Sequence, residues 1–346
     1  MNLTDRINSF VMLGEKLGRY HENSTDPVVK PLVEASNIAF QRNPWFTPEH
    51  IRMALNNLGK VLTKENLSIW LSGYASGIEG LTTQKRIGVV MAGNIPAVGF
   101  HDFLCVLLSG HKLLAKLSSS DDQLLPAMAE ILTKDLPEWK EYISFTSGKL
   151  EKFDAIIATG STNTSRYFEF YFGKYPHVIR RSRNSIAVLS GNETQHDLQN
   201  LANDIMLFFG MGCRSISKLY VPTGYDFSNL FIALNKYEYF ANHHKYRNNY
   251  DYCKSVFMVS QVPFIDTGYL LLTEDEAVAS RIAVLHYEFY DTPEAVDLKI
   301  RGKLELIQCV ISNLSLTFRT LHPGGGQIPA LWDYADQTDT MEFLIS

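Results

Sequence analysis

The chain has 346 residues, with 32 lysines and arginines against 37 aspartates and glutamates, and a formal net charge of -5 at pH 7. Hydrophobic residues make up 45% and charged residues 20%, a balance typical of a folded protein. The lack of a basic surplus argues against nucleic acid as a partner. No stretch reaches the length of a membrane helix and the N-terminus lacks a signal-peptide core, so we expect a cytoplasmic protein without a membrane span.

Residues 1–83 are expected to form a helical N-terminal segment. Thr47 suits a helix N-cap and Pro48 the first helical position of the stretch 47–62. Apolar residues then recur on one helical face at Ile51, Ala54, Leu55 and Leu58. No residue pattern in this segment indicates a reaction or a ligand.

From residue 85 onward, short apolar runs alternate with amphipathic stretches. This pattern is typical of a parallel sheet covered by helices. The runs predict strands at residues 86–92, 112–117, 141–146, 154–159 and 185–190. We therefore predict a doubly wound, Rossmann-like nucleotide-binding domain over residues 84–204.

A second α/β domain is expected over residues 205–322. Thr194 and Asp197 form a capping pattern that opens a helix, whose apolar spacing continues through Phe208 and Phe209 and leads to Cys213. The stretches 215–222 and 228–237 then predict a strand and a helix. Residues 323–346 begin in a glycine loop and continue as a tail that packs back on the body or on a second subunit. The predicted fold class is α/β with two doubly wound domains.

Three strand ends in the first domain carry residues that suit a ligand. A turn at Gly93-Asn94-Ile95-Pro96 follows the first strand, and Lys116 with Ser118, Ser119 and Ser120 follows the second. Gly160 permits close backbone approach, and Ser161 or Thr162 can cap a helix whose N-terminus faces an anion. Each end also has a plain structural reading, as a capped turn or a solvated lysine. No standard G-x-G-x-x-G follows these strands. The pair Gly210 and Gly212 lies at the end of a helix, where no helix N-terminus is available to bind a phosphate.

The four cysteines are isolated, with no C-x-x-C pair among Cys105, Cys213, Cys253 and Cys309. Neither a zinc site nor a disulfide scaffold is indicated. By local chemistry, Cys213 is either a nucleophile at an element boundary or a small buried side chain.

The segment 236–254 mixes aromatic residues with His243, His244, Lys245 and Arg247. It could stack on bases or hold a phosphorylated ligand, but the acidity of the chain favours a surface helix with half-buried tyrosines. A metal site formed from His243, His244 and Cys253 is poorly spaced, so we expect none.

Taken in order, four segments resemble the aldehyde dehydrogenase superfamily: GNIP (93–96), LLAKLSS (113–119), ATGSTNTSR (158–166) and GMGCRS (210–215). Within the superfamily the chain looks most like the acyl-CoA reductases of the bacterial-luminescence (LuxC) type. The tail PALWDYADQTDTMEFL (329–344) is also similar to the end of those proteins. The resemblance covers about residues 85–346.

The resemblance implies that Cys213 is the nucleophile, and that the Asn94 amide and the Cys213 backbone N–H form the oxyanion hole. Lys116 and Ser118 would face the adenosine ribose, and the cofactor would be lined by Gly160, Ser161 and Thr162. Where the dehydrogenases hold the ribose hydroxyls with an acidic residue, this chain has Ser119. A serine does not repel a 2′-phosphate, which favours NADP(H) over NAD(H).

Hydrolytic aldehyde dehydrogenases carry a glutamate base in an E-L-G-G-K-S-P stretch, and the matching stretch here places Arg180 near that position. Without the base, water is poorly activated. We therefore expect NADPH-dependent reduction of a long-chain fatty acyl-CoA or acyl thioester to the aldehyde through an acyl-cysteine, with Arg214 favouring the thiolate. The alternatives are an NAD(P)-dependent aldehyde dehydrogenase and an inactive scaffold subunit. A homo-oligomer and an acyl-activating partner enzyme are further expectations.

Overall fold

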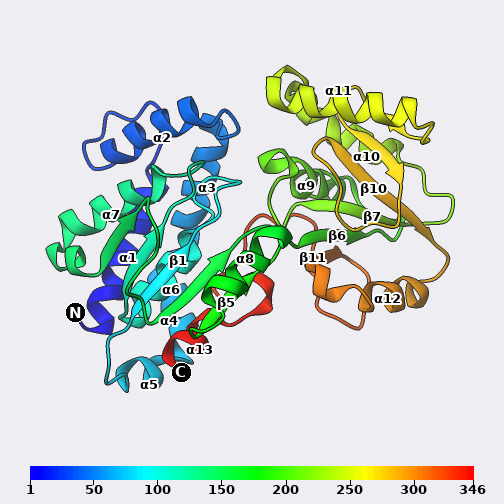
Figure 1. Ribbon diagram of the computed structural model, residues 1–346. Coiled ribbons are helices and arrows are strands. Elements are labelled where there is room, and N and C mark those ends of the chain that lie inside the picture. Colours follow the sequence, from blue (N-terminus) through cyan, green and yellow to red (C-terminus); the bar gives the residue numbers. More distant parts are fainter. The chain divides into compact units, whose positions relative to one another are not determined.

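The computed structural model describes residues 1–346, and the chain divides into two compact units (Figure 1). Unit 1 comprises Met1–Arg181 and Ala330–Ser346, and unit 2 comprises Ser182–Pro329. The boundary that the sequence analysis set at residue 204 therefore lies after Arg181 instead. The reason is strand pairing, because the strand that begins at Asn184 joins the second sheet and not the first.

Unit 1 contains a five-stranded parallel sheet in the order β3-β2-β1-β4-β5. Its strands are β1 (Arg86–Val90), β2 (Lys112–Lys116), β3 (Ile143–Thr146), β4 (Ala155–Thr159) and β5 (His177–Arg180). Four of them are the predicted runs. The fifth predicted run is wrong for this sheet, because its place is taken by β5, in which Val178 and Ile179 are adjacent and give no alternating apolar signal.

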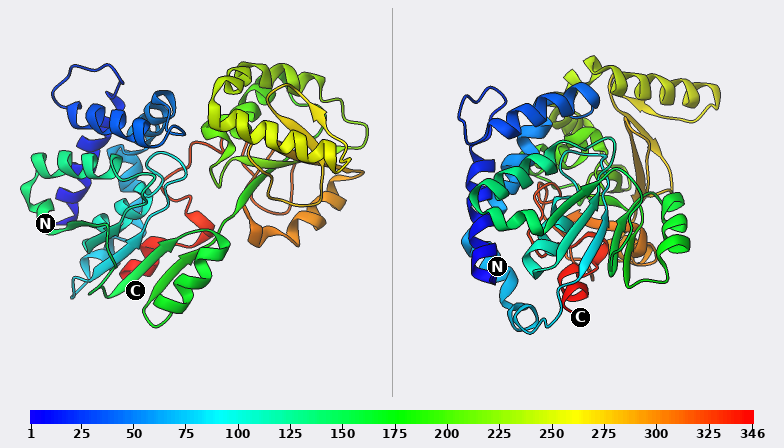
Figure 2. Two further views of the ribbon diagram at one scale, coloured as in Figure 1. Left: turned by 45° about the horizontal axis from the view of Figure 1, so that its top comes forward. Right: turned by 60° about the vertical axis from the view of Figure 1, so that its left-hand side comes forward.

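Helices cover both faces of this sheet. They are α1 (Leu3–Gly18), α2 (Lys30–Arg42), α3 (Pro48–Val61), α4 (Lys64–Ser72), α5 (Ala75–Glu79), α6 (Phe100–Ser109), α7 (Leu124–Asp135), the 3-10 helix η1 (Pro137–Glu141), α8 (Thr162–Phe172), η5 (Ala335–Gln337) and α13 (Thr340–Ile345). Ala155 and Ile157 of β4 share a core with the N-terminal helices, whereas Ile156 and Ala158 pack with α8. Figure 2 shows α8 and the N-terminal helices on opposite faces of this sheet. The alternation along β4 thus places the two helix layers.

The N-terminal helices belong to the core of unit 1. Thr47 caps α3 by accepting a hydrogen bond from the His50 N–H, as predicted. The Phe10 ring of α1 meets Phe100 of α6 edge-on at 6.4 Å and Trp139 at 5.7 Å. The segment 1–83 is therefore integrated with the sheet and is not a separate layer added to it.

The C-terminal tail docks on unit 1 of the same chain. Trp70 Nε1 donates to the hydroxyl of Tyr334 at 2.8 Å, and the Arg180 guanidinium donates to Thr340 Oγ1 at 2.7 Å. The sequence left open whether the tail packs on the body of the protein or on a second subunit, and in the structure it packs on the body. Hydrogen bonds from buried side chains set this docking.

Unit 2 contains a six-stranded sheet in the order β11-β6-β7-β10-β9-β8, parallel except for the β8–β9 pair. Its elements are β6 (Asn184–Val188), α9 (Gln195–Met206), η2 (Leu207–Gly210), β7 (Ile216–Pro222), α10 (Ser228–Leu234), η3 (Asn235–Asn242), α11 (His244–Val259), β8 (Ile265–Asp266), β9 (Leu271–Glu274), β10 (Val284–Tyr290), α12 (Pro293–Arg301), η4 (Leu304–Leu306) and β11 (Ile307–Ser312). Thr194 and Asp197 form a complete capping box on α9, as predicted. None of the helices in either unit combines the length and hydropathy that a membrane crossing requires.

Candidate active site

The turns that follow β1, β2 and β4 lie on one edge of the sheet of unit 1. Lys116 of β2 and Ala158 of β4 both pair with Val90 of β1. Because neighbouring strands lie roughly 4.8 Å apart, the segments that leave these three strands start side by side. This is the carboxyl edge, where open α/β sheets bind ligands. The structure therefore brings the predicted Asn94, Lys116 and Gly160 turns together.

The Asn94 turn is packed tightly against the serine loop that follows β2. A Cβ at Gly93 would lie 2.5 Å from Ser118 Oγ, so only glycine fits there. The Asp121 carboxylate accepts a hydrogen bond from the Ala97 N–H at 2.7 Å, and burial raises the pKa of Asp121 to about 7. Ala97 itself has φ 56, a left-handed conformation that costs energy in a residue with a Cβ. These contacts hold the turn that presents the exposed Asn94.

The two aspartates closest in sequence to Lys116 each interact with another residue of unit 1. Asp121 is buried on the Ala97 N–H, and Asp122 forms an ion pair with Arg42 at 2.8 Å. Ser119 is exposed beside them. Sequence reasoning did not find the Asp121 contact, which depends on the packing of two loops far apart along the chain.

The third turn opens helix α8. Ser161 is the N-cap and accepts a hydrogen bond from the Thr164 N–H at 3.2 Å, while Thr162 is the first helical residue. A Cβ at Gly160 would lie 2.9 Å from the ring of Phe168, so glycine lets the turn pack onto its own helix. The N-terminus of α8, with its free first-turn N–H groups and the positive end of the helix dipole, lies at this edge of the sheet. It favours an anion there.

Cys213 lies in unit 2, between η2 and β7, at the amino edge of the second sheet. It is exposed and in no disulfide, whereas Cys105 and Cys253 are buried and Cys309 is half-buried. Burial thus separates Cys213 from the other three thiols. A thiol must be accessible to attack a substrate, so Cys213 is the candidate nucleophile of this chain.

The turn before Cys213 has a left-handed backbone. Helix α9 ends at Met206, and then Phe208 (φ 54), Phe209 (φ 57) and Gly210 (φ 70) follow. The prediction that the helix continues through both phenylalanines is wrong, although their spacing is helical. Tertiary packing overrides this spacing, because the Phe209 ring packs against Phe240 with the ring centroids 4.4 Å apart. Such strained segments cluster at functional sites.

A glycine loop near the end of unit 2 supports the residue that follows Cys213. Asp204 of α9 accepts hydrogen bonds from the N–H groups of Gly324 at 2.6 Å and Gly326 at 3.0 Å. Arg214 Nε in turn donates to the Gly326 carbonyl at 2.6 Å. Burial raises the pKa of Asp204 to about 6. The sequence marked this loop by its glycines but did not connect it with Cys213.

Arg180 is a buried brace of unit 1. Its Nη1 donates to both carboxylate oxygens of Asp102, at 2.7 and 2.6 Å, and its side chain is 5% exposed. A guanidinium has no acceptor and stays protonated, so it cannot take a proton from water. Arg180 therefore offers no general base, and it holds the tail through Thr340.

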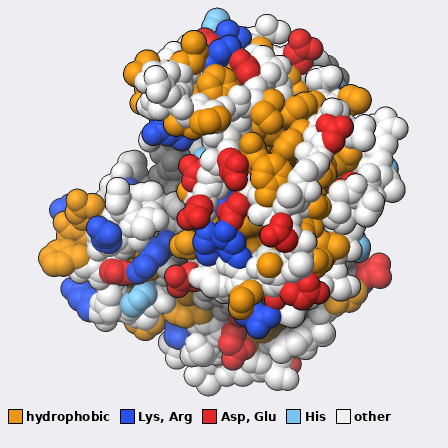
Figure 3. Space-filling view, turned by 90° about the vertical axis from the view of Figure 1, so that its right-hand side faces the viewer, with side chains coloured by type: hydrophobic (Ala, Val, Ile, Leu, Met, Phe, Trp, Pro, Cys, Tyr) orange, Lys and Arg blue, Asp and Glu red, His pale blue; other side chains and the backbone are white.

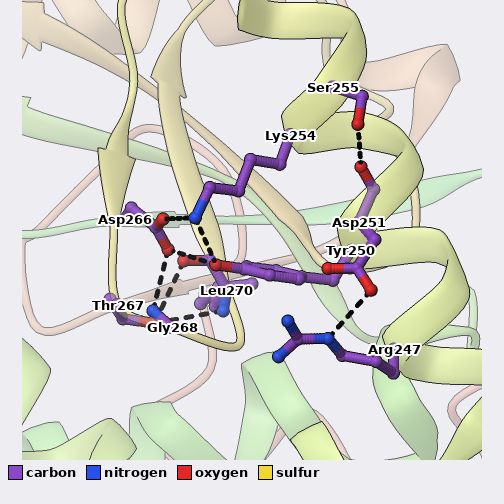
Figure 4. Close-up of polar contacts among 9 residues, drawn as sticks. All are labelled: Arg247, Tyr250, Asp251, Lys254, Ser255, Asp266, Thr267, Gly268 and Leu270. Atoms are coloured by element: carbon purple, nitrogen blue, oxygen red, sulfur yellow. Dashed lines mark hydrogen bonds and ion pairs between the residues drawn. The ribbon is translucent and has the colours of Figure 1, made fainter.

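The basic and aromatic segment 236–254 forms most of η3 and of α11, and two of its cations form ion pairs with aspartates (Figure 4). Arg247 Nε lies 2.9 Å from Asp251, and Lys254 Nζ lies 2.6 Å from Asp266. The Tyr250 hydroxyl also donates to Asp266. The surface helix that the sequence favoured is present. Its tyrosines are not half-buried as predicted, because Tyr237, Tyr246 and Tyr250 are buried and Tyr239 and Tyr252 are exposed. Across the whole structure, no three His, Cys, Asp or Glu side chains gather so that they could hold a metal ion.

Several solved structures, aldehyde dehydrogenases among them, share this fold. HpcC from Thermus thermophilus is similar with a TM-score of 0.63 and 12% identity, over 90% of this chain and 70% of that one. An indole-3-acetaldehyde dehydrogenase, AldA, from P. syringae gives 0.62 and 12%, over 90% and 72%. The NAD+ complex of an aldehyde dehydrogenase from Bacillus cereus gives 0.58 and 14%, over 90% and 72%. The predicted fold class, aldehyde dehydrogenase-like α/β, is confirmed.

Part of the sequence matches a family model. Residues 79–232, which include the Asn94, Lys116 and Gly160 turns and Cys213, match the family model described as acyl-CoA reductase (LuxC). No curated protein matches the chain by sequence. The predicted resemblance to the acyl-CoA reductases of the LuxC type is therefore confirmed over these residues.

Proposed function

We propose that this protein reduces a long-chain fatty acyl-CoA, or a related acyl thioester, to the aldehyde with NADPH, through an acyl-cysteine on Cys213. The observation that carries the proposal is Cys213 itself. It is the exposed cysteine of the chain, it follows a left-handed turn, and it lies inside the segment that matches the acyl-CoA reductases.

The first step is exchange of one thioester for another. The Cys213 thiolate attacks the acyl carbonyl and forms a C–S bond, and the tetrahedral oxyanion then collapses so that CoA leaves with the electron pair of the broken bond. Both sulfurs have similar basicity, so the exchange costs little. The Asn94 amide and the Cys213 backbone N–H would donate to the oxyanion.

The carboxyl edge of unit 1 fits a nucleotide by its donors. The Lys116 ammonium suits a phosphate or a ribose oxygen, and the N-terminus of α8 at Gly160, Ser161 and Thr162 suits an anionic group. When bound, NADPH supplies the hydride that reduces the acyl carbon of the acyl-cysteine. Cys213 then leaves the resulting thiohemiacetal with its electron pair, which releases the aldehyde and restores the thiolate.

Two features favour NADPH over NADH and aldehyde over acid. Ser119 stands where the dehydrogenases place an acidic ribose ligand, and the neighbouring Asp121 and Asp122 are committed to Ala97 and Arg42. No carboxylate from these residues is left to repel a 2′-phosphate. Arg180 cannot replace the missing base, so water attack on the acyl-cysteine has no support from that position.

Mass spectrometry of the whole chain after incubation with palmitoyl-CoA tests the proposal. We expect one acyl adduct on the Cys213 peptide with release of one CoA, and discharge to palmitaldehyde when NADPH is added. Cys213→Ala should lose the adduct, while Cys253→Ala, at a buried thiol, should keep it. Absence of an adduct on Cys213, or acid formed from aldehyde and NADP+, would overturn the proposal.

Self-association in the cytoplasm, and acyl delivery by an activating enzyme, complete the proposal. Helix α8 exposes Tyr167, Phe170 and Tyr171 to between 61 and 82%. Figure 3 shows a face on which further hydrophobic side chains gather, with acidic and basic side chains among them. Exposed apolar clusters of this kind mark protein interfaces. Light scattering behind size exclusion should show more than one chain per particle, and Phe170→Glu should reduce it if α8 contributes.

A further inference from the structure

A buried serine touches the backbone of the candidate nucleophile. Ser185 of β6 is 0% exposed, and its Oγ donates to the Cys213 carbonyl at 2.9 Å, across 28 residues of sequence. From the opposite side, the Cys309 N–H of β11 donates to the same Oγ at 3.2 Å, and the Cys309 Sγ lies 3.0 Å from it. Ser185 thus stands between the strand β11 and the Cys213 peptide.

The hydrogen-bond inventory leaves the hydroxyl a single orientation. A serine hydroxyl has one hydrogen and two acceptor lone pairs. Since the hydrogen goes to the Cys213 carbonyl, the N–H and the S–H of Cys309 take the two lone pairs. Every capacity of the hydroxyl is then used, which fixes its direction and, through it, the plane of the peptide that follows Cys213.

We propose that Ser185 is a positioning residue for Cys213, an inference that rests on the proposed function. The turn before Cys213 is strained at Phe208 and Phe209, and strained segments persist only where their surroundings determine them. Arg214 is tied to Gly326 on one side, and the Cys213 carbonyl is tied to Ser185 on the other. The two attachments hold the Cα of Cys213, and so the direction of its thiol, near the geometry that attack requires.

The chain offers a matched control. Ser312 of β11 is 3% exposed, and its Oγ donates to the Val188 carbonyl of β6 at 2.8 Å. It joins the same two strands with the same chemistry, but its bond is to β6 and not to the nucleophile segment. Loss of Ser312 therefore measures the general effect of one missing hydroxyl between β6 and β11.

The experiment measures alkylation of Cys213 by iodoacetamide in the whole protein, read by peptide mass spectrometry without any acyl substrate. Ser185→Ala should slow alkylation about 3- to 10-fold, the equivalent of one net hydrogen bond. Ser312→Ala should stay within about twofold of the parent, and Ser185→Thr, which keeps a hydroxyl, should restore most of the rate. With palmitoyl-CoA and NADPH, Ser185→Ala should lower kcat and leave KM unchanged.

An unchanged alkylation rate in Ser185→Ala, or an equal loss in Ser312→Ala, would overturn the positioning role. If Ser185→Ala does not fold, Ser185→Cys replaces it under the same criteria. The readout separates this inference from the proposed function. A parent protein that forms no acyl adduct contradicts the function, whereas an adduct combined with unchanged alkylation in Ser185→Ala contradicts the role of Ser185 alone.

Discussion

Removing Asp102 should destabilise unit 1 strongly, because the buried Arg180 guanidinium then has no carboxylate partner. Asp102 is 7% and Arg180 4% exposed, and two hydrogen bonds join them. Loss of one partner of such a buried pair costs about 3–5 kcal/mol, a large share of the roughly 5–15 kcal/mol that keeps a domain folded. Replacing both, as Asp102→Leu with Arg180→Met, removes the uncompensated charge and should cost only about 1 kcal/mol relative to the parent.

Tryptophan fluorescence in urea can follow this effect in one unit. All four tryptophans, Trp45, Trp70, Trp139 and Trp332, lie in unit 1. Asp102→Ala should shift the fluorescence transition to lower urea, and the double replacement should return it close to the parent. A decrease of less than about 1 kcal/mol in the free energy of unfolding of Asp102→Ala would contradict this prediction. So would a double variant whose loss of stability equals the sum of the two single-variant losses.

Three further outcomes are expected. Ser119→Glu should shift the ratio of kcat/KM with NADPH to that with NADH at least about tenfold toward NADH, since a carboxylate repels the 2′-phosphate; an unchanged ratio would remove Ser119 from the cofactor site. The pKa of Asp204 is raised from 3.8 to about 6 in the folded protein, so the folded state binds the proton more tightly and its stability falls as the pH rises through that window. Asp204→Asn should therefore flatten the pH dependence of the unfolding free energy in urea between about pH 4 and 6.5 by about 3 kcal/mol, and an unaltered slope would contradict this. Gly326→Ala, whose Cβ would lie 2.7 Å from the Asp204 carboxylate, should cost about 1–3 kcal/mol, whereas Gly302→Ala, with its nearest atom at 3.7 Å, should be nearly neutral by thermal unfolding.

Local signals predicted those elements whose cause is local. The Thr47 cap of α3, the Thr194–Asp197 box of α9 and the strands β1, β2 and β4 were found because caps and apolar runs act within a few residues. Strand β5 was missed because its two apolar residues, Val178 and Ile179, are adjacent and do not alternate with polar ones. The two phenylalanines before Cys213 kept a helical spacing, yet packing against Phe240 turned their backbone left-handed.

The sequence by itself determined the α/β class, the resemblance of residues 79–232 to the LuxC acyl-CoA reductases, and the order of the segments that hold Asn94, Lys116, Gly160 and Cys213, because motifs and apolar runs are local patterns along the chain. That Cys213 acts as the nucleophile stays a prediction for the acyl-adduct experiment. Only the tertiary structure decided which sheet each strand joins, that Arg180 serves a buried ion pair, and that Ser185 and the glycine loop support the residues around Cys213. Those contacts join residues from 28 to more than 100 positions apart, and no local pattern encodes a hydrogen bond that forms only when distant strands and loops meet.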